Sequence, residues 1–224
     1  MRFPNAQAGV KKIFSAEILA LIASFCSMMM VVFLYFMTKT VDADGNITSG
    51  GAAVASLGGT AVFGMAATVL AVISFIFKII GVKKASIDED GFKTAFYLIL
   101  GGIAVALVKG VVSSFTDNNT VSNIFSIIND VITLAITIFI IQSIINLAIK
   151  LNDDDMVKRG NNLFKIIIAM YVLIIIANIV ILITGSTAGV AIAGVFGLIS
   201  GILSIVQYIL YLAYLNKAKK MLEA

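Results

Sequence analysis

The chain has 224 residues, of which 60% are hydrophobic and only 12% are charged. A soluble domain averages about 45–50% apolar and about 25% charged residues, so a surface made from this composition has to face lipid instead of water. The chain has no His and a single Cys, Cys26, which excludes the usual zinc, haem and iron–sulfur ligand sets and both Ser-His-Asp and Cys-His catalysis. We therefore expect an integral membrane protein that is not an enzyme, has no catalytic or metal-binding residues, and carries no cofactor.

Six apolar stretches are long enough to cross a bilayer, which takes about 20 mostly apolar residues in a helix. The runs are continuous and lack the alternation of a membrane β-barrel, so helices are predicted. We expect residues 1–224 to form a single all-α membrane domain with about six transmembrane helices, arranged as three consecutive helical hairpins. In chain order the predicted spans are Ile13–Met37, Ala52–Ile80, Thr94–Phe115, Val121–Ile149, Leu163–Thr184 and Ala188–Leu215.

The basic residues indicate how these spans are oriented. All but two of the 16 Lys and Arg residues lie in the two termini or in and beside the second and fourth connections; the exceptions are Lys39 and Lys109. Cytoplasmic loops retain Lys and Arg, so we expect a multi-pass protein of the cell membrane with both termini in the cytoplasm. The net charge of +4 is thus a topology signal and does not indicate nucleic-acid binding. The Ile-, Lys- and Asn-rich composition is typical of a bacterial protein.

The starts of the odd-numbered spans carry a weak internal repeat. Gly9-Val-Lys-Lys-Ile-Phe14 precedes the first span, Gly91-Phe-Lys-Thr-Ala-Phe96 the third, and Gly160-Asn-Asn-Leu-Phe164 the fifth, one residue shorter. Two interpretations stay open: a true threefold repeat of hairpins, or the recurrence of basic and glycine residues wherever a helix enters from the inside.

Small residues recur at steps of four in three spans. They are Gly51, Ala55 and Gly59 in the second, Gly102, Ala106 and Gly110 in the third, and Gly189, Ala193, Gly197 and Gly201 in the sixth. Residues four apart share a helix face, and small ones let two backbones approach closely. These stripes predict helix–helix contacts, either inside one bundle or between copies in a homo-oligomer.

Lys109 is the most informative residue because it is a charge inside an apolar span. Asn129 and Asp130 reach a similar depth on the following antiparallel span, and Asn178 does so in the fifth span. Intramembrane charges are functional-site candidates by default, so these four residues are the candidate ligand or ion pathway. The alternative is a Lys109–Asp130 ion pair that only fixes the register of the hairpin, or a Lys109 that extends to the headgroups.

A second polar group is expected toward the cytoplasm, formed by Glu17, Gln142, Asn146 and Gln207. For Glu17, pairing with a basic neighbour is favoured over proton transfer.

These features favour a small transport or permeation protein, or the membrane subunit of a transport system. The alternative is a non-catalytic packing, assembly or immunity-type membrane protein without a transport pathway. The expected partners are the lipid bilayer and either a second copy of the chain or a transporter partner subunit, and no nucleic acid.

Overall fold

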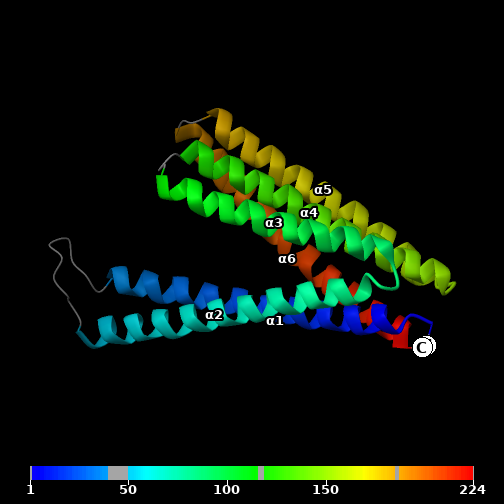
Figure 1. The fold of residues 1–224 in the computed structure, drawn as a ribbon. Coiled ribbons are helices and arrows are strands. Elements are labelled where there is room, and N and C mark those ends of the chain that lie inside the picture. Colours follow the sequence, from blue (N-terminus) through cyan, green and yellow to red (C-terminus); the bar gives the residue numbers. More distant parts are fainter. Residues whose placement is uncertain (1, 40–49, 116–118, 185–186, 224) are drawn as a thin grey trace. The chain divides into compact units, whose positions relative to one another are not determined.

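The computed structural model describes residues 2–39, 50–115, 119–184 and 187–223. Within these ranges it describes every side chain except those of residues 38–39, 50–53, 119–120, 174–175, 177–184 and 187–204. Six helices follow one another along the chain (Figure 1): α1 (Pro4–Lys39), α2 (Gly50–Ala85), α3 (Asp90–Phe115), α4 (Asn119–Lys150), α5 (Asp154–Thr184) and α6 (Thr187–Glu223). The described ranges contain no strand, so the all-α prediction is confirmed.

Four of the helices are long and apolar enough to cross a membrane, over Pro4–Met37, Val54–Ala85, Asp90–Phe115 and Val121–Lys150. Only 6 to 22% of the most apolar stretch of each is buried inside the protein. Apolar side chains exposed along a whole helix need a lipid environment. Much of the predicted fifth and sixth spans lies outside the described side chains, so the six-span arrangement stays a prediction.

Most helices extend past the predicted spans at the ends that carry basic residues. Helix α1 begins at Pro4, where the fixed φ of proline suits the first helical position, instead of at Ile13. Helix α5 begins at Asp154, and the carboxylate of the preceding Asp153 accepts the backbone N–H of Met156 at 3.0 Å, which caps the helix. Polar residues at these ends continue the helices without lengthening the apolar segment.

Two compact units can be distinguished, one of residues 12–80 and one of residues 1–11 with 81–224, and each is described by itself. In the unit of residues 12–80, α1 and α2 pair antiparallel. Ser74 donates its hydroxyl to the Ala16 carbonyl at 2.8 Å, and further along the pair the Phe33 and Phe63 rings stack at 5.6 Å. The predicted small-residue contact of α2 is present at Gly59, where an added Cβ would meet the Phe33 ring.

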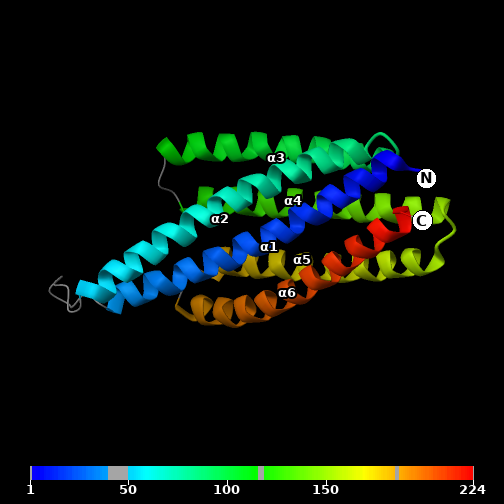
Figure 2. The same ribbon diagram turned by 90° about the horizontal axis from the view of Figure 1, so that it is seen from below.

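In the other unit α3 packs on α4, α4 on α5, and α5 on α6, so neighbours in sequence are neighbours in space (Figure 2). One end of this unit holds residues 2–11, the α2–α3 and α4–α5 connections and the last turns of α6; it is called the basic end below. Fully buried apolar side chains gather there, among them Val10, Val82, Phe92, Ile144, Leu147 and Leu215. Toward the opposite end, Leu107, Val111 and Phe115 of α3 are exposed. Among the described side chains of this unit, the fully buried apolar ones are therefore concentrated at the basic end.

The acidic α2–α3 connection fastens the start of α1. The carboxylate of Asp88 accepts the backbone N–H of Ala6 at 2.7 Å and the side-chain amide of Asn5 at 3.0 Å. The first N–H groups of a helix have no partner inside the helix, and a negative charge there also complements the helix dipole. Asp88 therefore caps a helix more than eighty residues earlier in the chain.

The next residue, Glu89, ties α3 to α4. Glu89 is only 9% exposed, and its carboxylate accepts hydrogen bonds from Asn146 at 3.0 Å and from Lys150 at 2.5 Å. A buried carboxylate is tolerated when hydrogen bonds and a cation compensate its desolvation. The acidic residues of this connection are thus structural ties.

The three glycines of the internal repeat all lie against a neighbouring helix. A Cβ on Gly9 would lie 2.5 Å from the Gly81 carbonyl of α2, one on Gly91 would collide with the Ser143 hydroxyl of α4, and one on Gly160 would lie 2.5 Å from both the Tyr214 hydroxyl of α6 and Ile145 of α4. The nearest obstacle is thus backbone at Gly9 and side chains at Gly91 and Gly160. Whether the hairpins arose by duplication stays a hypothesis.

The stripe of α3 behaves differently. An added Cβ on Gly102 would make ordinary contact with Ile132 of α4 at 3.4 Å, whereas one on Gly110 would have nothing within 4 Å. Among the described residues, the predicted close helix contact is therefore not formed at Gly110. The corresponding stripe of α6, between residues 189 and 201, lies outside the described side chains.

Candidate functional site

A cavity of about 340 Å³ lies between α3 and α4. Its walls come from one face of each helix, and they are Val105, Ala106 and Lys109 of α3 and Phe125, Ser126, Asn129 and Asp130 of α4. Three of the four residues predicted as the ligand or ion pathway, Lys109, Asn129 and Asp130, therefore line one hollow.

The depth of this cavity follows from helix geometry. Lys109 precedes the end of α3 at Phe115 by six residues, or about 9 Å at 1.5 Å per residue. Asp130 follows the start of α4 at Asn119 by eleven residues, or about 16 Å. Both charged groups thus lie well inside the apolar helices and nearer to the α3–α4 connection than to the basic end.

Lys109 and Asp130 line the same cavity but form no ion pair with each other across it. Both are partly exposed, and no ion pair within 4.0 Å joins them in the described part of the chain. The hydroxyl of Ser126 donates to the Ser122 carbonyl of its own helix at 3.0 Å. The cavity thus presents an ammonium, a carboxylate and an amide to a small molecule or to water.

The fourth candidate, Asn178, lies on α5, and its side chain is outside the described residues. Its membership of the site stays a prediction.

The residues of the second predicted polar group have different contacts within their own units. Glu17 is 6% exposed and pairs with Lys78 of α2 at 2.8 Å, so it does have a basic partner. Asn146 donates to Glu89 and belongs to the tie between α3 and α4. Gln142 is exposed and Gln207 is partly buried, and neither belongs to that tie. Glu17 belongs to the unit of residues 12–80 and the other three residues to the other unit, so a common site of the four stays a prediction.

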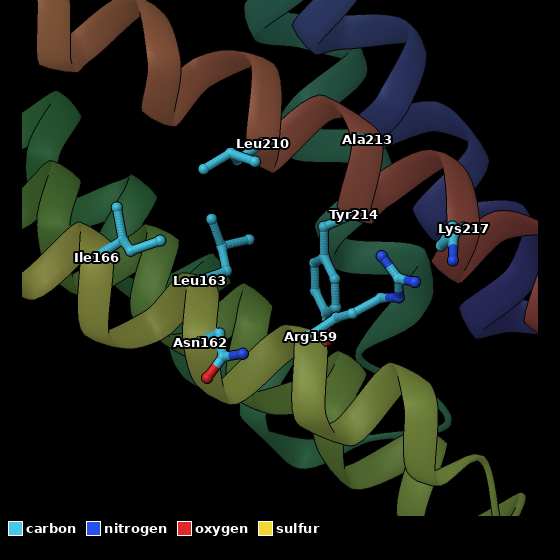
Figure 3. A pocket seen from close by; sticks show the side chains of 8 residues that line it. All are labelled: Arg159, Asn162, Leu163, Ile166, Leu210, Ala213, Tyr214 and Lys217. Carbon is cyan, nitrogen blue, oxygen red and sulfur yellow. The ribbon is translucent and has the colours of Figure 1, made fainter.

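Sequence reasoning missed a second hollow of about 220 Å³, between α5 and α6 at the basic end. Figure 3 shows its lining: Arg159, Asn162, Leu163 and Ile166 of α5, and Leu210, Ala213, Tyr214 and Lys217 of α6. From the sequence alone, the basic residues are interpreted only as a topology signal. The spacing i, i+3, i+4, i+7 in both sets was the available signal, because it places four residues on one helix face.

Asp155 joins the two cations of this hollow. Its Oδ2 accepts Arg159 Nε at 2.7 Å and Lys217 Nζ at 3.4 Å. The hydrogen bond from Arg159 is the main cause that lowers the pKa of Asp155 below its usual value, and Lys217 adds to it. Asp155 is therefore ionised at neutral pH and compensates part of the local positive charge.

Within the described ranges, no group of three or more His, Cys, Asp or Glu residues could hold a metal ion. Comparisons of the chain with protein-family models, with curated proteins and with solved structures find no match. The chemistry of the two hollows therefore carries the functional argument.

Proposed function

We propose that this protein is a small transport or permeation protein, or the membrane subunit of a transport system, and that the cavity of Lys109, Asn129 and Asp130 binds its solute. The proposal includes six spans in three hairpins, both termini in the cytoplasm, and a location in a bacterial cell membrane. The cavity would then open toward the outer face, because it lies nearer to the α3–α4 connection.

The observation that supports this function is that the intramembrane charges line a cavity and do not pair. Inserting a charge at the middle of a membrane helix costs about 2.5–3.5 kcal/mol or more. A pair that only fixed register would recover this cost through direct contact, yet no such contact within 4.0 Å is found between Lys109 and Asp130. Water or a polar solute in the cavity would compensate both charges.

The size and lining of the cavity suggest the class of solute. Ligand sites of drug-sized molecules measure about 300–1,000 Å³, so a cavity of about 340 Å³ suits a small one. An ammonium and a carboxylate on facing helices match a small zwitterion or a small polar molecule with both donors and acceptors. Glycine is therefore a suitable first probe.

The first test asks whether the cavity is wet. With Cys26 replaced by Ser, Ala106→Cys should react with a small charged thiol reagent, because Ala106 lines the cavity. Leu107→Cys is the matched control, since Leu107 is 67% exposed on α3 outside the cavity and would face lipid. Equal failure of both cysteines to react would mean a dry packing defect and would favour the non-transport alternative.

The second test compares Lys109→Met, Asp130→Leu and the double variant with the wild type by thermal unfolding and by a proteoliposome swelling assay. Thermal unfolding in detergent should give a coupling below about 1 kcal/mol, as for weakly interacting exposed charges. Swelling of proteoliposomes in iso-osmotic glycine should exceed that of empty vesicles for the wild type and be lost in all three variants. Lys84→Met, which removes an exposed cation elsewhere, should keep the wild-type rate.

Two results would contradict the proposal. Wild-type vesicles that swell no faster than empty ones would leave the protein without the proposed pathway. A double variant with the full wild-type rate would show that the charges serve packing alone.

A further inference from the structure

The hollow between α5 and α6 changes from polar to apolar along its length. Arg159 begins the α5 set and Lys217 ends the α6 set, and both contact Asp155, so the two cations lie at the same end. Ile166 and Leu210 lie at the other end of their sets, seven residues along each helix, or about 10 Å away. The hollow is thus a groove with a cationic mouth and an apolar floor.

The groove follows the direction that a lipid molecule takes in a bilayer. Its mouth is at the basic end, and its floor leads into the predicted apolar span of α5, which begins at Leu163. In Figure 3, Leu163 and Leu210 approach each other across the groove, while Arg159 and Lys217 lie together at the opposite end. Basic pockets between membrane helices on the cytoplasmic side recognise anionic lipid headgroups.

The cations at the mouth are accessible and only partly compensated. The side chains of Arg159 and Lys217 are 52% and 47% exposed, so a ligand can reach them. Asp155 bonds Arg159 through Nε, and in the described part of the chain the terminal guanidinium nitrogens have no recorded acceptor. Asp155 is the carboxylate that bonds both cations, and the charge of Asp153 acts on Tyr214 of the groove. A guanidinium fork matches the oxygens of a phosphate.

We propose that this groove is a binding site for one anionic phospholipid, with the headgroup phosphate held by Arg159 and Lys217 and an acyl chain along Leu163, Ile166 and Leu210. At about 220 Å³ the groove takes the phosphate and the first part of one chain, and the rest of the molecule stays in the bilayer. Asn162, three residues further along α5 than Arg159, also lines the groove. Asp155 competes with the phosphate for both cations.

The proposal is tested on the full chain in a non-ionic detergent, with binding of phosphatidylglycerol counted by native mass spectrometry. Each basic residue at a membrane surface changes affinity about fivefold, so the variant Arg159→Gln/Lys217→Gln should bind about 25-fold more weakly. Asp155→Asn should bind more tightly than the wild type, because the competing carboxylate is gone. Lys84→Gln removes an exposed cation of the same end outside the groove and should leave the affinity unchanged.

Two further probes separate the possible occupants. Phosphatidylcholine supplies the chains without net negative charge, and glycerol 3-phosphate supplies the phosphate without chains; both should bind at least tenfold more weakly than phosphatidylglycerol. Equal binding of phosphatidylcholine would mean ordinary contact with bulk lipid, and equal binding of glycerol 3-phosphate would mean a site for a soluble anion. Either result overturns the proposal, as does unchanged binding in the double variant while its lipid-free melting temperature stays that of the wild type.

Discussion

The contact between Gly91 and Ser143 allows a substitution to be designed together with its rescue. A Cβ on Gly91 would collide with the Ser143 hydroxyl, but it would lie 3.5 Å from Ser143 Cβ and 3.7 Å from the Phe139 carbonyl, which are ordinary contacts. Ser143 is fully buried, and its hydroxyl donates to Phe139 at 2.6 Å. Only one oxygen atom therefore prevents alanine at position 91.

The expected energies follow from this geometry. Overpacking costs about 1–3 kcal/mol, and replacing a helical glycine by alanine returns about 0.5–1 kcal/mol, so Gly91→Ala should destabilise the protein by about 1–2 kcal/mol. Ser143→Ala alone should cost about 0–1 kcal/mol, because a bond of serine to the carbonyl four residues earlier contributes little to a helix. The double variant should return close to the stability of the wild type.

Thermal unfolding in detergent measures all three variants, at about 2–4 °C per kcal/mol for a chain of this size. Gly110→Ala is the control, since no atom lies within 4 Å of its added Cβ, and it should raise the melting temperature slightly. A melting temperature that is lowered by Gly91→Ala and stays equally low in the double variant would refute the reasoning. A rise in melting temperature for Gly91→Ala equal to that for Gly110→Ala would refute it as well.

Two further predictions concern the start of α1 and the orientation of the chain. Gly9→Ala should lower stability by at least about 2 kcal/mol in thermal unfolding, because the Gly81 carbonyl at 2.5 Å is backbone and no single side-chain truncation relieves it; a neutral result would mean that α1 and α2 separate there freely. With Cys26 replaced by Ser, an impermeant maleimide should label Asn46→Cys and Asn119→Cys on intact cells, and Ser86→Cys and Asn161→Cys only after permeabilisation. Labelling of Ser86→Cys on intact cells would reverse the orientation.

The sequence by itself determined the helical class and the presence of helices long and apolar enough to cross a membrane. Both follow from composition and from the length of continuous apolar runs, which depend on no contact between distant residues. The sequence also places Lys109 and Asp130 on consecutive helices nearer to the α3–α4 connection than to the basic end, although Asp130 lies five residues further from its helix end than Lys109 does. Sequence thereby brought three of the four cavity candidates to one place.

Only the tertiary structure decided what the polar residues near the basic end do. Asp88 caps α1, and Glu89 bonds Asn146 and Lys150 of α4. The sequence does not predict these contacts, because the partners are 57 to 83 positions away in the chain. The groove between α5 and α6 was missed for the same reason. In the sequence, Arg159 and Lys217 are explained by the positive-inside rule alone. That both contact Asp155 depends on how α5 and α6 are rotated about their axes. At Gly160 an added Cβ would meet Tyr214 of α6 and Ile145 of α4, so the packing of α5 there involves both neighbouring helices.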